Sequence, residues 1–188
     1  MHVNRLKGFT LVEVIFGIVL MAIVLTIVTG LLAPQAKQSA DPVIQVKANE
    51  LGQAMMNEIL GRSFDEKSRR SPPYTQCGIA PNLCKSPSDL GCDGPEEKDI
   101  NGKCIRNKLN DVDDFIGNYQ AADLQNSLGQ PVEDLYPGFS LSVTVVYDDD
   151  ANGVADTSGD FNTLKLITVT VTAPTGDVYG FSAYKGNY

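Results

Sequence analysis

The sequence contains a single histidine, His2, close to its amino-terminal end. A hydrolase triad needs an imidazole base and most catalytic zinc sites need histidine ligands, so both kinds of site lack their central residue here. The chain also shows no nucleophile paired with a base and no phosphate-binding glycine loop. We therefore expect a protein that performs no catalysis.

Acidic residues outnumber basic residues in this sequence. The chain has 15 Lys and Arg against 23 Asp and Glu, a formal net charge of -8. Two of the basic residues, Arg5 and Lys7, lie in residues 1–8, and without them 13 basic residues face 23 acidic ones. No basic patch offsets this acidic balance, which argues against a nucleic-acid partner.

Charge is almost absent from residues 9–33 (FTLVEVIFGIVLMAIVLTIVTGLLA), where Glu13 is the one charged residue. Twenty helical residues span a hydrocarbon core of roughly 30 Å, so this segment predicts a transmembrane helix. The run is too long for a secretory signal, and residues 33–40 offer a poor cleavage site. Arg5 and Lys7 precede it and no basic residue follows before Lys37. The amino terminus is therefore expected in the cytoplasm and residues after about 34 outside it.

A carboxylate in a membrane helix costs about 2.5–3.5 kcal/mol, so Glu13 needs a partner. Cleavage after Gly8 would make Phe9 the new amino terminus and would place Glu13 about one helical turn from its amine. The Glu13 carboxylate could then pair with the amine of its own chain or of a neighbouring chain. Pairing between chains would set the axial register of packed helices, which is a mechanism of assembly.

The run Lys7-Gly8-Phe9-Thr10-Leu11-Val12-Glu13, followed by about 20 apolar residues, resembles the class III signal of type IV pilins and type II secretion pseudopilins. The resemblance implies that prepilin peptidase cuts after Gly8 and methylates the Phe9 amine, and that Glu13 is the assembly carboxylate. It also implies an α+β fold in which a long amino-terminal helix packs on a carboxy-terminal antiparallel sheet.

Four regions follow from these patterns: a leader (1–8), a transmembrane and assembly helix (9–33), an amphipathic stem helix (34–62) and an exported globular domain (63–188). Gly30 and Pro34 are expected to loosen or kink the helix, and Pro42 to mark a second break. In the stem, apolar residues recur at three- and four-residue spacing and should pack on a sheet: Ile44, Ala48, Leu51, Met55 and Ile59.

All four cysteines lie in a polar, loop-like insertion, residues 71–111: Cys77, Cys84, Cys92 and Cys104. Their spacing fits no zinc motif, and an even number of cysteines in an exported domain predicts two disulfides. The connectivity stays open; nested pairs (77–104 with 84–92) and sequential pairs (77–84 with 92–104) are both feasible.

The region after the insertion begins with Asp111-Val-Asp113-Asp114, which predicts a helix start because acidic residues are favourable near a helix amino terminus. The alternative for these carboxylates is a metal site. The pattern then predicts three antiparallel strands, at residues 138–147, 164–172 and 178–184. On the first of them, alternate residues from Phe139 to Tyr147 should share one face.

The loop between the first two strands, residues 148–160, is acidic. Its Asp148-x-Asp150-x-Asn152-Gly153-x-x-Asp156 spacing is typical of a calcium loop, with Asp160 as a further oxygen donor. A bidentate glutamate at the twelfth position is missing, since Gly159 stands there. The alternative is a solvated hairpin loop, in which Asp, Asn and Gly are common anyway.

We expect a minor pilin that assembles with other pilins through a pilus platform. It would start as a single-pass inner-membrane protein and end at the cell surface. The NDVDDF stretch (110–115), the acidic hairpin and the SAYKGNY terminus (182–188) are similar to minor pilins of mannose-sensitive haemagglutinin (MSHA) pili. The alternatives are a minor pseudopilin of type II secretion and a calcium-dependent adhesin module on a pilin stem.

Overall fold

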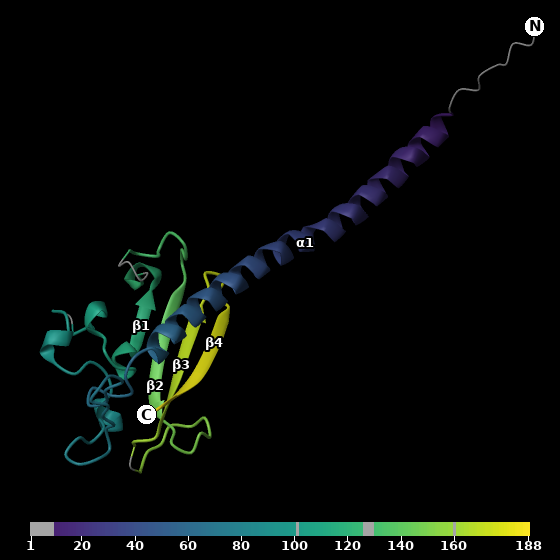
Figure 1. Cartoon of the computed structure of the whole chain (residues 1–188). Coiled ribbons are helices and arrows are strands. Elements are labelled where there is room, and N and C mark those ends of the chain that lie inside the picture. Colours follow the sequence, from purple (N-terminus) through teal and green to yellow (C-terminus); the bar gives the residue numbers. More distant parts are fainter. Residues whose placement is uncertain (1–9, 101, 126–129, 160) are drawn as a thin grey trace, which may run out of the picture. The chain divides into compact units, whose positions relative to one another are not determined.

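A computed structural model describes residues 10–188, apart from residues 101, 126–129 and 160 and the side chains of residues 31–41. A helix, α1 (Leu11–Leu60), precedes short 3-10 turns and four strands (Figure 1). The chain divides into two compact units, Met1–Gln45 and Val46–Tyr188, and α1 contributes to both. The expected α+β class, a long amino-terminal helix followed by an antiparallel sheet, is confirmed.

Helix α1 has 50 residues and continues through Gly30, Pro34 and Pro42. The predicted break at Pro42 is therefore wrong, and the transmembrane and stem regions, 9–33 and 34–62, share one continuous helix. A proline removes one backbone hydrogen bond but does not have to end a helix. The neighbouring residues are largely good helix formers (QAKQSA before Pro42 and QVKANELGQAM after it), which sustain the helix on both sides.

The sheet is antiparallel with the order β1-β2-β3-β4, and its strands are β1 (Gly117–Gln120), β2 (Ser140–Tyr147), β3 (Leu164–Thr172) and β4 (Val178–Gly186). Three of them confirm the predicted strands, and β1 was missed. Four residues, GNYQ, are too few to show an alternation. Pairing with β2, in which Tyr119 lies opposite Leu141, makes this segment a strand.

The helix expected at Asp111 is a single 3-10 turn, η4 (Asp113–Phe115). The Asp111 carboxylate begins the turn by accepting the N–H groups of Asp113 (3.0 Å) and Asp114 (3.2 Å). Ile116 then adopts a non-helical ψ of 124°, and β1 starts at Gly117. The acidic residues do begin a helical turn, as predicted. The residues after this turn pair with the sheet, so the turn does not extend into a longer helix.

The core lies between residues 46–60 of α1 and one face of the sheet. Four residues of the predicted stripe are buried there, Ala48, Leu51, Met55 and Ile59, together with Met56. The buried residues of β2 and β3 alternate as expected and are Leu141, Val143, Val145, Tyr147, Ile167, Val169 and Val171. Gly52 allows α1 to approach β4 closely, because a Cβ atom at this position would collide with the ring of Phe181.

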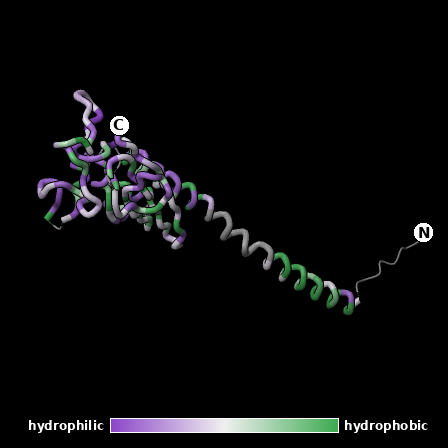
Figure 2. The backbone as a smooth tube through the Cα atoms, turned by 90° about the horizontal axis from the view of Figure 1, so that it is seen from below, coloured by the Kyte–Doolittle hydropathy of each residue, from purple (hydrophilic) through white to green (hydrophobic). Residues whose placement is uncertain are grey.

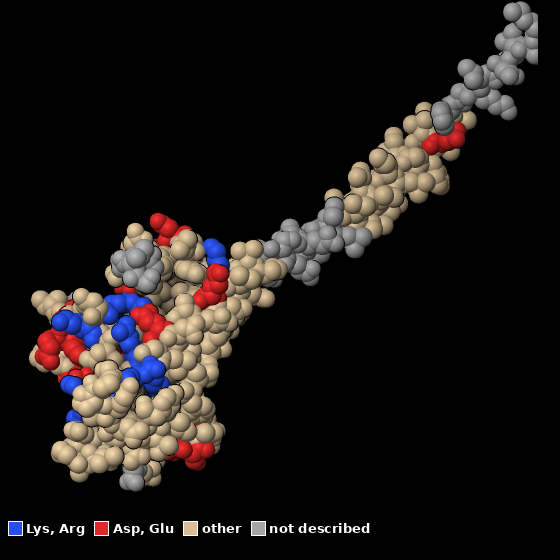
Figure 3. All heavy atoms as spheres, in the orientation of Figure 1, with Lys and Arg blue, Asp and Glu red and all other residues tan. Residues whose placement is uncertain are grey.

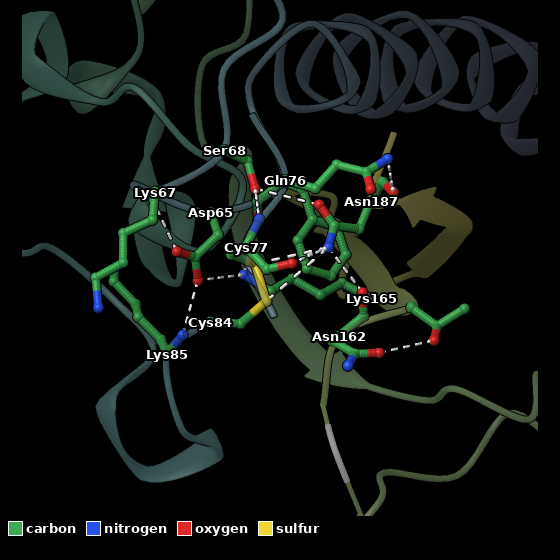
Figure 4. The surroundings of a disulfide bond; sticks show 12 residues. Asp65, Lys67, Ser68, Gln76, Cys77, Cys84, Lys85, Asn162, Lys165 and Asn187 are labelled. Carbon is green, nitrogen blue, oxygen red and sulfur yellow. Dashed lines mark hydrogen bonds and ion pairs between the residues drawn. A yellow bond between two sulfur atoms is a disulfide. The ribbon is translucent and has the colours of Figure 1, made fainter. Parts of the chain in front are cut away.

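The insertion contains three 3-10 turns, η1 (Pro87–Asp89), η2 (Pro95–Glu97) and η3 (Arg106–Lys108), and two sequential disulfides, Cys77–Cys84 and Cys92–Cys104. The prediction of two bridges is confirmed and its connectivity is resolved. Figure 4 shows Asn187 beside the first bridge. Its Nδ2 donates to the carbonyl oxygens of Cys77 (3.0 Å) and Asn162 (2.8 Å), so the carboxy-terminal end fixes this loop.

Lys165 occupies an inward-facing position of β3, in line with Ile167 and Val169, and is 0% exposed. Its Nζ donates to the Asp113 carboxylate (2.6 Å) and to the carbonyl oxygen of Phe64 (2.7 Å). Burial alone would raise the pKa of Asp113, but the ammonium groups of Lys165 and Lys85 hold it below its usual value. The ion pair thus joins the middle of the sheet to η4.

Lys85 approaches the same carboxylate from the insertion. Its Nζ lies 2.7 Å from Asp113 Oδ2, 2.7 Å from Asp93 Oδ1 and 2.7 Å from the carbonyl oxygen of Gly91. These carboxylates raise the pKa of Lys85 although burial opposes the shift, so the residue stays charged. Asp113 is consequently shared between two lysines from distant parts of the chain.

Replacing Lys165 with Met should lower the free energy of unfolding by about 3–5 kcal/mol, because Asp113 would stay buried with part of its charge unpaired. Equilibrium urea unfolding of the detergent-solubilised, disulfide-intact chain measures the change. Lys108→Met, at an exposed lysine of η3, is the matched control and should change the free energy by less than about 0.5 kcal/mol. Equal effects of the two substitutions would contradict a stabilising role of the pair.

Candidate functional site

The amino-terminal end of α1 carries the first candidate residues. The Thr10 hydroxyl oxygen accepts the backbone N–H of Glu13 at 3.3 Å, as a helix-capping side chain does. Glu13 lies in the first turn, where the unpaired N–H groups of the helix favour a negative charge. Gly8 and Phe9, the predicted cleavage residues, lie outside the described residues.

The segment Leu11–Gly30 follows, with 20 residues and a mean hydropathy of 2.9. By length and composition it can cross a membrane. Figure 2 shows its hydrophobic character, and in Figure 3 charged atoms on this segment appear only near its beginning. Large apolar side chains are exposed around it, among them Leu11 and Phe16. An exposed helix that is apolar on all sides needs lipid or other apolar helices around it.

Two hydroxyl groups in this segment are satisfied within the helix. Thr26 Oγ1 donates to the carbonyl oxygen of Ala22 and Thr29 Oγ1 to that of Leu25, both at 2.8 Å. Such bonds let threonine enter an apolar environment without an unpaired donor. Glu13 therefore remains the one charged side chain of the segment.

The second candidate is the acidic loop between β2 and β3. Carboxylate oxygens of Asp148, Asp150 and Asp156 lie within 4.8 Å of one another, as the calcium-loop spacing predicts. Gly153 has a φ of +84°, the left-handed conformation that the sharp turn of such a loop requires. Asp160, the further predicted donor, lies outside the described residues.

Backbone N–H groups hold the first carboxylate of this loop. Asp148 Oδ1 accepts the N–H of Asn152 at 2.9 Å, and Oδ2 accepts that of Gly153 at 2.8 Å. The Tyr184 hydroxyl on β4 also donates to Oδ2, at 2.5 Å. Burial would raise the pKa of Asp148, but these hydrogen bonds together lower it and keep the carboxylate ionised.

Asn152, a predicted calcium ligand, forms two side-chain hydrogen bonds within the loop. Its side-chain oxygen accepts the N–H of Val154 at 2.7 Å, and its Nδ2 donates to Asp150 Oδ2 at 2.8 Å. The amide thus orients Asp150 within the loop.

A comparison with protein families finds the prokaryotic N-terminal methylation motif at residues 4–29. The match is confined to the amino-terminal segment, which is similar to that of type IV pilins and pseudopilins. The motif implies processing by prepilin peptidase and assembly with other pilins, and the α+β architecture with its long amino-terminal helix agrees with it. Comparisons with curated proteins and with solved structures gave no match.

Two residues that support the acidic loop were not predicted from the sequence. Tyr184 comes from another strand, so no local motif could indicate its bond to Asp148. Asp149 closes the loop instead of pointing toward the other carboxylates: its Oδ1 accepts the N–H groups of Thr163 (3.0 Å) and Leu164 (2.7 Å).

Proposed function

We propose that the chain is a minor structural subunit of a type IV pilus and has no catalytic role. The observation that carries the proposal is the methylation motif at residues 4–29, combined with an apolar 20-residue helical segment that has one carboxylate in its first turn. The folded unit from Val46 onward then serves as the exported head of the subunit.

Within this proposal, prepilin peptidase cuts between Gly8 and Phe9 and methylates the Phe9 amine. The new amine carries a positive charge about one helical turn from Glu13. In an apolar environment the Glu13 carboxylate gains a partner from this amine, in the same subunit or in the neighbouring one. The precursor is a single-pass inner-membrane protein with a cytoplasmic amino terminus, and the assembly platform moves it into the filament.

The finer assignment is a minor pilin similar to the D-type minor pilin of MSHA pili. Its support is the NDVDDF stretch, which forms η4, and the SAYKGNY terminus, which ends β4. A minor pseudopilin of type II secretion would have the same amino-terminal chemistry. Recovery of the subunit in filaments sheared from the cell surface supports the pilus, and loss of protein secretion after gene deletion supports the pseudopilin.

Substitution of Gly8 by Val should leave the precursor uncleaved in the membrane, because the peptidase would no longer find glycine before the scissile bond. Intact mass and amino-terminal sequencing measure the outcome. Gly17→Ala is the matched control, since a Cβ at Gly17 meets nothing within 4 Å, and this variant should be cleaved normally. A mature amino terminus at Phe9 in the Gly8 variant would refute the site.

Glu13→Gln should be cleaved and inserted normally but should be depleted at least about tenfold from sheared filaments. The loss of one carboxylate removes the partner of the amine, and about 1.4 kcal/mol corresponds to a tenfold change. Immunoblots of the sheared and membrane fractions measure the distribution. Thr29→Val, which removes a hydroxyl satisfied within its own helix, should assemble like the parent chain.

We also propose that the acidic loop binds Ca²⁺ through Asp148, Asp150 and Asp156. Clustered carboxylate oxygens suit a hard cation, and the glycine turn with its N–H bonds to the first aspartate fits a calcium loop. Asp160 and the Asn152 amide remain candidates for further ligands. Calcium-dependent adhesion is the second candidate function that this loop supports.

Millimolar Ca²⁺ should then stabilise the chain. With a dissociation constant of about 0.1–1 mM, about 10 mM Ca²⁺ adds about 1.4–2.7 kcal/mol to the free energy of unfolding. Thermal melting with and without Ca²⁺ tests this, and Asp150→Asn/Asp156→Asn should remove most of the shift. Glu133→Gln/Asp134→Asn, at exposed carboxylates outside the loop, is the control. An unchanged midpoint in the parent chain would rule out the loop as a calcium site.

A further inference from the structure

A second group of carboxylates lies in the insertion, where the loop closed by Cys92–Cys104 meets η4. Asp93 directly follows Cys92, Glu97 is the last residue of η2, and Asp114 is the middle residue of η4. One carboxylate oxygen from each lies within 4.8 Å of the others. The spacing of these residues along the chain matches no calcium motif, so the fold alone assembles the group.

The carboxylates of this group are held in place by N–H donors. Glu97 Oε2 accepts the backbone N–H of Asp93 at 2.8 Å, and Glu97 Oε1 accepts the side-chain amide of Asn110 at 3.3 Å. Asp114 Oδ2 accepts the backbone N–H groups of Asn110 (2.8 Å) and Asp111 (3.2 Å). Positions fixed in this way require no large rearrangement to receive a ligand.

An unpaired oxygen is the independent observation. Asp114 is 0% exposed, and its Oδ1 is buried without a hydrogen-bond partner. A buried acceptor of this kind costs about 1–3 kcal/mol, and more when it is charged. The oxygen belongs to one of the three carboxylates that converge, so a cation bound by both oxygens of Asp114 would satisfy it.

Charge balance points to a cation. Lys85 forms an ion pair with Asp93, and its other contacts go to Asp111, Asp113 and the Gly91 carbonyl oxygen. In the part of the chain that the structure describes, neither Glu97 nor Asp114 forms an ion pair.

We propose that Asp93, Glu97 and Asp114 form a divalent-cation site, suited to Ca²⁺, that ties the Cys92–Cys104 loop to η4. The donors are all oxygen atoms, which a hard cation prefers, and Ca²⁺ accepts irregular geometry with water as remaining ligands. The Asp93 side chain is 25% exposed, so the site opens to solvent on that side, whereas Glu97 and Asp114 form its buried base. The site is separate from the acidic loop between β2 and β3.

The experiment uses the full chain in detergent with both disulfides intact, after dialysis against a chelator. The substitutions Asp150→Asn/Asp156→Asn first remove the acidic loop as a competing site. Isothermal titration with CaCl₂ should then report one Ca²⁺ per chain. Adding Asp93→Asn/Glu97→Gln to this background should weaken binding by more than about tenfold, because two ligand charges are lost.

The matched control adds Asp89→Asn/Glu96→Gln, two exposed carboxylates of the same insertion, and should bind as the background does. Absence of Ca²⁺ binding in the background, or unchanged affinity after Asp93→Asn/Glu97→Gln, would overturn the proposal. If the double substitution prevents folding, Asp93→Asn alone decides, since its side chain is partly exposed: weaker binding supports the site and unchanged binding refutes it. Neither result bears on calcium binding by the acidic loop between β2 and β3, which the thermal-melting experiment tests separately.

Discussion

The ion pair between Lys165 and Asp113 is the constraint on which the folded unit Val46–Tyr188 depends. It places an ammonium group where the alternation of β3 would otherwise bring an apolar side chain, with the rings of Phe64 and Tyr147 at 4.6 and 5.1 Å from Nζ. A charge so deeply buried requires a fixed partner. The turn η4 and the segment after α1 must therefore take up fixed positions against the sheet.

The insertion follows from that pair, because it has little apolar core of its own. Its buried apolar cluster joins Phe64 and Cys77 to Tyr147 of the sheet, with Cys84 and Leu90 packed against it. Polar contacts hold the rest: Lys85 connects the insertion to Asp113, and Asn187 connects it to the end of β4. Two disulfides between cysteines close in sequence, together with polar contacts to residues distant in sequence, thus stabilise the insertion in place of a hydrophobic core.

Much of the fold is predictable from periodicity. The three- and four-residue spacing from Ala48 to Ile59 and the two-residue alternation of β2 identify the packing faces, and the amino-terminal motif indicates the assembly segment. The remainder depends on partners distant in sequence. The alternation of β3 places Lys165 in the core, but nothing local identifies Asp113 as its partner, and Tyr184 reaches Asp148 across the sheet. β1 and the disulfide connectivity are likewise properties of the tertiary structure.

The sequential connectivity of the disulfides has a consequence for maturation. A chain delivered in sequence order presents Cys77 and Cys84 before Cys92 and Cys104, so the first partner available to each cysteine is the correct one. The two bridges span separations of only 7 and 12 residues. Both bridges can therefore form before the carboxy-terminal strands are made and without reshuffling of mispaired bonds.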